Sequence, residues 1–291
     1  MHDITPAAAD GPSRRRLAAE AAWGLFGLAG FVALWWASIA LLVPPDSFLA
    51  RFAPAEAFGS LAELVASGQL SGHIAASLRR IAGGLALAVA VGIPLGLAIG
   101  SIRALGQATG PIFGFVRMIS PLAWTPLAII LFGVGDAPVY FLIAIGAMWP
   151  VVLNTASGVA GLERGWLMVA HSLGGSRREI LRHVVWPGVR GQVLTGLRLA
   201  TGVAWLILVP AEMLGVDSGL GYYILDARDR FAYDELVAAI IVIGALGFAI
   251  DLIARRLFAV RRRGPGWRSA GRKVLLDATP RRAADRVHQH S

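Results

Sequence analysis

Few residues in this chain of 291 belong to the types that perform chemistry, and their spacing indicates no catalytic centre. The sequence contains no cysteine, which excludes disulfides, iron–sulfur ligation and thiol catalysis. His73, His171 and His183 lack the spacing of metal ligands. Neither a Gly-Lys-Ser/Thr phosphate loop nor a recognisable group of nucleophile, base and acid is present. We therefore expect no catalytic residue, no metal and no cofactor, and no ATP hydrolysis by the chain itself.

Charged residues inside apolar segments are the more informative candidates. Glu212 lies near one end of a long apolar segment, where a carboxylate is costly and is by default a candidate functional residue. It lines a pathway or gate, pairs with Arg79 or Arg80, or is an interfacial carboxylate that simply reaches water. Because like charges repel, a role in structure or gating is favoured over direct binding of an anion. Arg198 either attracts anions into a pathway or extends to the membrane interface, and the second interpretation is favoured.

The apolar composition of the whole chain shows which elements must position these residues. Hydrophobic residues make up 56% of the sequence and charged residues 15%, with a mean hydropathy of +0.64, whereas soluble domains carry about 25% charged residues. A helix needs about 20 apolar residues to cross a bilayer. The candidate spans are 22–43, 81–101, 118–135, 138–158, 193–214 and 236–257. We therefore predict an all-α integral membrane protein with about six transmembrane helices, the third kinked by Pro121 and Pro126.

The distribution of arginine predicts the topology, since cytoplasmic loops of membrane proteins carry an excess of Arg and Lys. Arg14–Arg16, the 159–192 loop and the C-terminal tail are basic, whereas the 215–235 loop is mostly acidic. The net charge of +9 therefore fits membrane topology better than nucleic-acid binding. Both termini and the 159–192 loop are expected in the cytoplasm. Arg79 and Arg80 break this pattern, and we expect them to snorkel or to pair with an external acid.

Four parts of the chain follow from these patterns. They are a cytoplasmic N-terminal tail (1–21), the first transmembrane helix with an external segment (22–74), a core transmembrane domain (75–258) and a basic cytoplasmic tail (259–291). The last part is rich in arginine and has little apolar periodicity, so we expect it to be disordered.

The 159–192 loop is the most informative part of the chain, and two short amphipathic helices are predicted in it. The first carries its apolar face at helical spacing, on Leu162, Trp166, Val169, Ala170 and Leu173. Gly174 and Gly175 end this helix, because glycine accepts the left-handed turn at a helix C-terminus. The second helix starts at Ser176, which has the spacing of a capping box with Glu179.

The second helix has its own apolar face, on Ile180, Leu181, Val184 and Val185. Pro187 is predicted to stop it, because proline lacks a backbone N–H. A compact hairpin of this kind suits docking into a groove on a soluble partner, whose motion it would pass to the spans. A plain cytoplasmic connection lying on the membrane surface fits the same residues equally well.

The spacing within this loop resembles the EAA loop of ABC importer permeases. That pattern is Glu-Ala-Ala, three residues, Gly, nine residues, Ile, one residue and Leu-Pro. Here Met168-Val169-Ala170 stands for the first element, and the later elements follow at the same spacing as Gly174, Val184 and Trp186-Pro187. Met168 replaces the glutamate and Trp186 the leucine, so a carboxylate at position 168 is not required in this chain.

The resemblance extends over roughly 75–257, to the nitrate, sulfonate and taurine subfamily of these permeases. The segments that carry it are Pro121–Leu127, Leu131–Asp136, Gly196–Ala200, Ala204-Trp205, Ala211–Leu214 and Gly219–Tyr222. It implies a type I ABC importer (MetI-like) permease fold in a bacterial inner membrane. It also implies a homodimer of permeases, a cytoplasmic ATPase dimer docked on the EAA loops, and a periplasmic or lipid-anchored solute-binding protein.

The resemblance also assigns candidate site residues and a solute class. The ATPase-coupling residues that it implies are Ala170, Gly174, Gly175, Ser176, Glu179, Val184 and Pro187, and the candidates for the pathway or gate are Glu212, Arg198 and Trp124. A small anion such as nitrate, an aliphatic sulfonate or taurine is the expected solute. Cyanate, bicarbonate or a neutral pyrimidine precursor of thiamine remain alternatives within the subfamily. A passive channel and a membrane-embedded enzyme are alternatives from other classes.

Overall fold

The computed structural model describes residues 14–44 and 46–258, and within them the secondary structure is entirely helical. The predicted all-α class is therefore confirmed. The segments 1–13 and 259–291, which hold most of the predicted tails, lie outside the described residues. The α-helices are α1 (Arg14–Leu42), α2 (Pro54–Ser67), α3 (Gln69–Ser101), α4 (Arg103–Val116), α5 (Thr125–Phe132), α6 (Asp136–Ala160), α7 (Arg164–Ser172), α8 (Arg177–Ile180), α9 (Trp186–Glu212), α10 (Leu220–Asp229) and α11 (Tyr233–Leu257). Shorter turns are η1 (Phe48–Phe52), η2 (Pro121–Trp124) and the π-helical η3 (Leu181–Val185).

Five helices of the described part are long and apolar enough to cross a membrane, and a sixth span is reached if one bent pair is counted together. The five are α1, α3, α6, α9 and α11, and each covers one predicted span. Their ends differ from the prediction by a few turns at most. The first helix already begins at Arg14, within the segment 1–21 that was predicted to be a tail.

The third span, predicted as a helix over 118–135 kinked by Pro121 and Pro126, is instead broken just before Pro121. Helix α4 and the following helical segment η2–α5 meet at an angle of 86° across a short break. Helix α5 has only 8 residues. It therefore rises about 12 Å, whereas the hydrocarbon core of a bilayer is about 30 Å thick. Proline explains the break: Ser120, which precedes Pro121, takes an extended backbone, as residues before proline do. The segment 103–116, predicted to be a connection, is helix α4.

Helices α3, α6 and α9 form the packed core, and small residues allow their close approach. On α3, a Cβ at Gly92 would lie 3.0 Å from Val151 of α6, and a Cβ at Gly96 would lie 2.6 Å from Thr155. On α9, a Cβ at Gly196 would lie 2.9 Å from the carbonyl oxygen of Pro150 on α6. Glycines spaced about four residues apart therefore let these helices pack in contact with one another.

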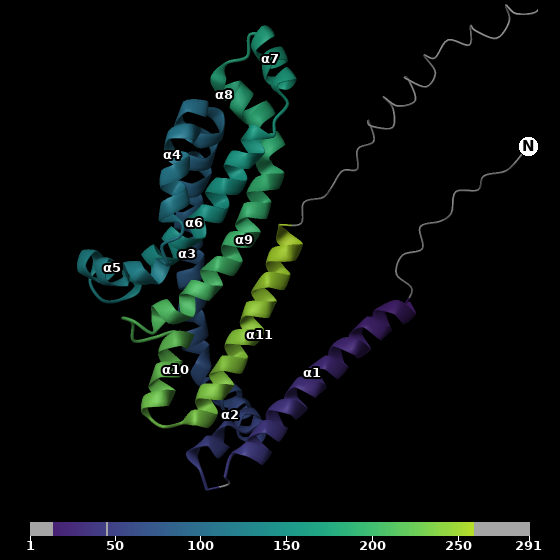
Figure 1. Ribbon diagram of the computed structural model, residues 1–291, viewed down its shortest axis with the longest axis vertical. Helices are drawn as coiled ribbons and strands as arrows, with labels where there is room; N and C mark the ends of the chain where they lie inside the picture. The colour runs from purple at the N-terminus through teal and green to yellow at the C-terminus, as the bar shows by residue number, and fades with distance from the viewer. Residues whose placement is uncertain (1–13, 45, 259–291) are drawn as a thin grey trace, which may run out of the picture.

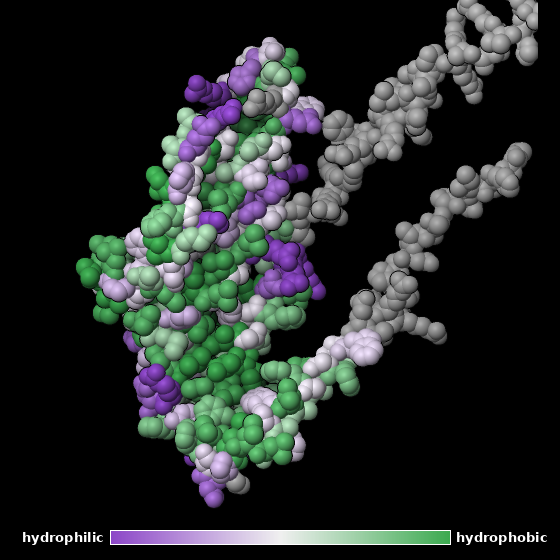
Figure 2. Space-filling view, in the orientation of Figure 1, coloured by the Kyte–Doolittle hydropathy of each residue, from purple (hydrophilic) through white to green (hydrophobic). Residues whose placement is uncertain are grey.

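The long helices lie along the longest dimension of the molecule (Figure 1). Helices α7 and α8 form one end, α2 and α10 lie at the other, and α5 projects sideways about halfway between them. Helix α1 diverges from the bundle and is exposed along most of its described length. Hydrophobic side chains cover much of the face drawn in Figure 2, and hydrophilic ones gather at the α7–α8 end and in a patch at mid-height on the right, near the end of α11. This banding fits a protein that crosses a bilayer lengthwise.

The pairing of α3 with α6 gives a scale of depth. Near the α10 end, Arg80 contacts Asp136. Near the α7–α8 end, a Cβ at Gly100 would lie 2.6 Å from the Cβ of Val159. The stretch of α3 between these contacts rises about 30 Å, which matches the hydrocarbon thickness of a bilayer. We therefore take Arg80 and Gly100 as the two edges of the apolar slab.

A second cluster of buried side chains closes the α10 end of the molecule. It joins α2, α3, α10 and α11 through residues such as Leu64, Leu70 and Leu220. Tyr223 belongs to it and donates a hydrogen bond to Glu235 over 2.8 Å. Burial and this carboxylate raise the pKa of Tyr223 to about 12, so its hydroxyl stays protonated and keeps donating well above neutral pH.

Candidate functional site

The α7–α8 hairpin contains the break that the sequence predicted. Gly174 has φ of +76°, in the left-handed region. Its N–H donates to the carbonyl oxygen of His171 over 2.9 Å, and the N–H of Gly175 donates to that of Ala170 over 3.1 Å. This pair of bonds is a Schellman motif, which satisfies the last carbonyls of α7. Both glycines therefore fix the angle at which the chain leaves α7.

The start of α8 is fixed by a capping box, as predicted. The Ser176 hydroxyl accepts a hydrogen bond from the backbone N–H of Glu179 over 3.3 Å. The Glu179 carboxylate in turn accepts one from the backbone N–H of Ser176 over 2.9 Å. Both ends of the short connection are thus held by local hydrogen bonds. Hydrogen bonds fix the backbone on both sides of the turn, so the hairpin is not a flexible tether.

Pro187 does not stop the second loop helix, and this part of the prediction is wrong. The helix continues without interruption from Arg177 to Glu212, over 36 residues. A π-helical turn, η3, accommodates the proline: the N–H of Trp186 donates to the carbonyl oxygen of Leu181, five residues back. The wider turn adjusts the hydrogen-bond ladder just where Pro187 lacks a donor. The loop is therefore continuous with the spanning helix α9.

The apolar side chains of the hairpin are divided between two faces, not gathered on one as predicted. The inward face packs onto the base of α9 through Leu162, Leu167, Ala170 and Val184, against the buried Ile180, Val185, Val189 and Val193. The outward face of α7 is apolar and exposed: Trp166 is 61% exposed, Met168 65%, Val169 55% and Leu173 82%. We call these four residues the tip patch. The hairpin is thus anchored on one side and presents an apolar surface on the other.

Glu212 is fully buried, and it pairs with Arg80, as one of the sequence interpretations allowed. The Arg80 side chain is 1% exposed and that of Glu212 is 0% exposed, and Nη1 of the guanidinium lies 2.8 Å from Oε1 of the carboxylate. Arg80 also donates from Nε to Asp136 over 2.8 Å and from Nη1 to the carbonyl oxygen of Ser218 over 2.6 Å. The prediction that Arg79 and Arg80 pair with an acid is confirmed, since Arg79 also contacts Asp136.

The second carboxylate oxygen of Glu212 is equally well satisfied. It accepts hydrogen bonds from the Ser77 hydroxyl over 2.9 Å and from the backbone N–H of Gly221 over 3.0 Å. Gly219 approaches the pair at φ of +105°, and a Cβ there would overlap the Glu212 carboxylate. The network joins α3, the start of α6, the end of α9 and the loop before α10. Its geometry is that of a structural clamp, because the Glu212 carboxylate is fully buried and both of its oxygens accept hydrogen bonds from within the protein.

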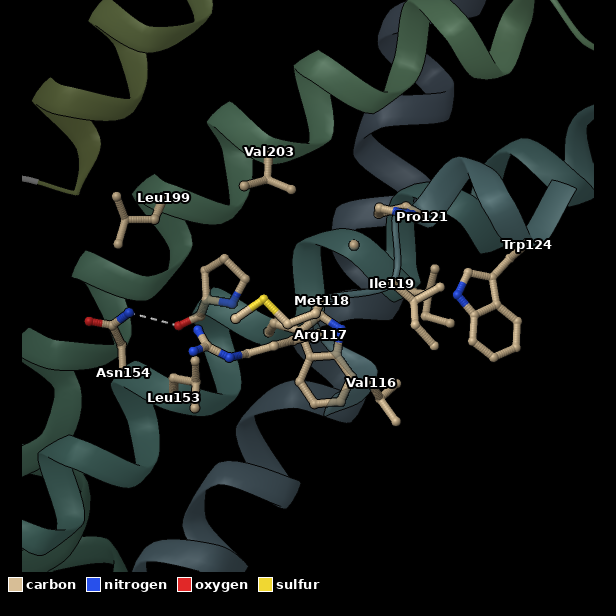
Figure 3. Close-up of a pocket in the computed structure, with 14 residues that line it drawn as sticks. Val116, Arg117, Met118, Ile119, Pro121, Trp124, Leu153, Asn154, Leu199 and Val203 are labelled. Atoms are coloured by element: carbon tan, nitrogen blue, oxygen red, sulfur yellow. Dashed lines mark hydrogen bonds between the residues drawn. The ribbon is translucent and has the colours of Figure 1, made fainter. Parts of the chain in front are cut away.

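A cavity of about 410 Å³ lies beside the core, between the α4–α5 break, α6 and α9. Figure 3 shows the side chains around it, including Arg117, Trp124 and Asn154. The predicted pathway residue Trp124 therefore does line a cavity, whereas Arg198 is exposed and lies outside its lining. Arg117 lies just before the predicted third span, and nothing local in the sequence indicated that it lines a cavity.

The described residues hold no group of three or more His, Asp or Glu side chains arranged to bind a metal ion. The site thus consists of three features on one helical scaffold. They are an anchored hairpin with an exposed tip patch, a buried charge clamp at the opposite end, and a cavity between them. This arrangement defines a multi-pass membrane protein that has an exposed interaction surface at one end and a cavity between its spanning helices.

Comparison with known proteins identifies the class. Residues 92–263 match the family of binding-protein-dependent transport system inner membrane components, and the chain belongs to this family. The fold is that of a type I ABC importer permease: a chain of the methionine ABC transporter MetNI, solved in inward-facing conformations, superposes with a TM-score of 0.54 at 15% identity. That match covers 66% of this chain and 94% of the other.

Three relatives illustrate the sequence similarity. A putative ABC transporter permease of Methanocaldococcus jannaschii is 39% identical over 65% of this chain and 71% of its own length. The bicarbonate transport system permease of Synechococcus elongatus is 39% identical over 60% of this chain and 64% of its own length. The taurine transport system permease of Escherichia coli is 37% identical over 67% of this chain and 70% of its own length. The chain is thus a permease component of an ABC importer.

Proposed function

We propose that the α7–α8 hairpin couples a separate cytoplasmic ATPase to solute movement through the spans. The observation that carries this proposal is the tip patch on a hairpin whose inner face is packed onto α9. Exposed apolar patches of this kind mark interaction surfaces. Because the hairpin continues into α9 without a break, a displacement of the tip would be passed to that helix. Ala170, Gly174, Gly175, Ser176, Glu179, Val184 and Pro187 hold the hairpin in shape.

The assembly that follows contains two copies of this permease, two ATPase subunits and a solute-binding protein. In it the α7–α8 end faces the cytoplasm, together with both termini, and the α10 end faces the binding protein. The basic charge of the 159–192 loop supports this orientation. The permease itself is not an enzyme and carries no cofactor, and ATP is used by the partner. Residues 75–258 form the core permease unit, and 22–74 add the first span.

The proposed solute is a small anion. Relatives named for taurine and bicarbonate support this class, and a further one in Leptolyngbya laminosa is named a nitrate import permease. Nitrate, bicarbonate, taurine and other aliphatic sulfonates are therefore the first candidates. Cyanate and a neutral thiamine-type pyrimidine follow as alternatives.

Isolation of the complex from its native membranes in mild detergent tests the assembly. An ATPase recovered at one copy per permease is the expected result. A binding protein recovered with it can then be screened against the candidate solutes. A homo-oligomer that retains no ATPase after crosslinking would overturn the proposal, and it would favour a passive channel or a membrane-embedded enzyme instead.

Replacing Gly174 by valine is expected to abolish ATP-dependent uptake while leaving the protein in the membrane. A β-branched residue is strongly disfavoured at φ of +76°, so the turn between α7 and α8 must change its angle. Uptake and ATPase activity are measured in proteoliposomes that contain the whole complex. We expect uptake to fall at least tenfold.

Gly165→Ala provides the matched control. Gly165 lies in α7 of the same hairpin, and a Cβ there would meet no atom within 4 Å. This change should leave uptake within twofold of the unchanged protein. Equal uptake by the Gly174→Val and Gly165→Ala proteins would show that the shape of the hairpin does not matter for coupling.

A further inference from the structure

Arg117 follows directly on α4, which starts near the α7–α8 edge of the apolar slab. Arg117 itself lies at mid-depth of the spanning region. Phe113, one turn before it, packs on Trp149 of α6 with ring centroids 5.4 Å apart. Trp149 lies 13 residues along α6 from Asp136, a rise of about 20 Å from the α10-side edge. After Arg117 the chain reaches Pro121, whose ring lies 2.9 Å from the position of a Cβ on Gly146. Both contacts place Arg117 well inside a slab of about 30 Å.

The surroundings of Arg117 contain hydrogen-bond donors and no acid. Among the side chains that the structure describes (22–44, 46–163 and 165–258), no carboxylate lies within ion-pair distance of its guanidinium, in contrast to Arg79 and Arg80. Trp124 and Trp149 line the same cavity and carry indole N–H groups. The amide of Asn154 donates one N–H to the carbonyl oxygen of Pro150 over 2.8 Å, which leaves its second N–H available. Figure 3 shows Arg117 and Asn154 on adjoining sides of this space.

A cation at this depth needs compensation. Charged side chains within the membrane are costly, and they usually face a partner charge or a water-filled pathway. The guanidinium stays protonated in proteins, so it cannot avoid the cost by losing its charge. A carboxylate of this chain compensates Arg80, but none of the described residues does so for Arg117. A negatively charged ligand bound in the cavity would supply this missing compensation.

We propose that Arg117 is the residue that binds the transported anion midway through the membrane, in the cavity between the α4–α5 break, α6 and α9. This inference rests on the proposed transport function and deepens it. The planar guanidinium presents parallel N–H donors that match the two oxygens of a carboxylate, nitrate, bicarbonate or sulfonate. The cavity of about 410 Å³ is large enough for any of these small oxyanions. The site favours them over a neutral pyrimidine, which leaves the charge uncompensated.

The test uses the complete transporter, with its ATPase and binding protein, in proteoliposomes. Uptake of isotope-labelled nitrate, bicarbonate and taurine, and of the neutral probe 4-amino-5-hydroxymethyl-2-methylpyrimidine, is measured for the unchanged protein and for Arg117→Gln and Arg117→Lys. We expect Arg117→Gln to lower the maximal uptake rate of the accepted anion at least tenfold. Arg117→Lys should retain more of the rate, because the charge is kept and only the paired geometry is lost. Arg117 is exposed, so neither change should lower the yield of folded protein.

Arg103→Gln is the matched control. Arg103 is an exposed arginine at the opposite end of the same helix, α4, and lies outside the cavity lining. It should transport at the unchanged rate. Equal anion uptake by Arg117→Gln and Arg103→Gln would overturn the inference while leaving the transport function intact, and so would uptake of the neutral probe alone. Loss of the permease pair in Arg117→Gln would also overturn it, by assigning the compensating charge to the second copy. Failure of the unchanged complex to import any probe with ATP would instead overturn the proposed function.

Discussion

Replacing Glu212 by alanine is expected to lower the free energy of unfolding by about 3–5 kcal/mol, because a buried guanidinium then loses its buried carboxylate partner. The group that loses this carboxylate is the Arg80 guanidinium, whose side chain is 1% exposed. It keeps its contact with Asp136 but loses the carboxylate on its other side. The hydroxyl of Ser77 and the N–H of Gly221 lose their acceptor in the same substitution. The measurement is thermal unfolding in detergent, followed by tryptophan fluorescence.

Arg79→Ala is the control for this prediction. Arg79 adjoins Arg80 in sequence and also pairs with Asp136, but its side chain is 63% exposed. Exposed ion pairs contribute roughly 0–1 kcal/mol, so this change should hardly move the unfolding temperature. A second test removes both charges together in Arg80→Met with Glu212→Leu. That protein should be more stable than Glu212→Ala, because no lone charge remains buried. If Glu212→Ala unfolds at the same temperature as Arg79→Ala, the clamp does not stabilise the fold.

Replacing Gly96 by valine is the second change with a large expected effect. A Cβ at this position would lie 2.6 Å from the Cβ of Thr155 and 2.7 Å from the carbonyl oxygen of Val152. The carbonyl belongs to the backbone of α6 and has no rotamer by which to move aside. We therefore expect α3 and α6 to separate locally, at a cost of about 3 kcal/mol or more, which is the upper part of the range for overpacking. The yield of folded monodisperse protein and its unfolding temperature report the effect.

Gly244→Val separates steric overlap from the general effect of valine in a helix. Gly244 lies inside α11, and a Cβ there would meet no atom within 4 Å. Because valine has a helix propensity no worse than that of glycine, this protein should unfold within about 0.5 kcal/mol of the unchanged one. Equal losses of stability in Gly96→Val and Gly244→Val would mean that the close approach of α3 to α6 does not contribute to the free energy of unfolding.

Helix α9 connects the functional features. Its start is continuous with the α8 segment of the hairpin, and its end carries Glu212 in the clamp. Between these points it lines the cavity with Leu199 and Val203. A movement at the tip patch can thus reach both the cavity and the clamp along one rigid element. The variants at Gly174, Arg117 and Glu212 probe three levels of the same helix and its neighbours.

The sequence by itself determined the features whose causes lie within a few residues. Apolar runs of about 20 residues predict spanning helices, since a helix of that length satisfies its own backbone hydrogen bonds in lipid. The Gly174 turn and the pairing of Ser176 with Glu179 were predictable for the same reason: both depend on hydrogen bonds that close within one helical turn. The family resemblance rested on the spacing of the loop residues around Gly174 and on further short segments over roughly 75–257.

Local reasoning failed where a neighbouring helix or turn decides the outcome. Pro187 was expected to end a helix, but the π-helical turn before it absorbs the missing donor. Trp166, Val169 and Leu173 fit one amphipathic face in the sequence, yet they are exposed, because the base of α9 packs against the other side of α7. Helical periodicity shows that a face is apolar, but it does not show what covers that face.

Only the tertiary structure decided which charges are paired. Glu212 and Arg80 are 132 residues apart, and the sequence could offer Arg79 and Arg80 only as two equal candidates. The packing of α3 against α6 and α9 turns Arg80 inward and leaves Arg79 exposed. The same packing, with the α4–α5 break, brings Arg117 to a cavity at mid-depth. Pairing over such separations depends on where whole helices lie, and no local hydrogen bond or periodicity encodes it.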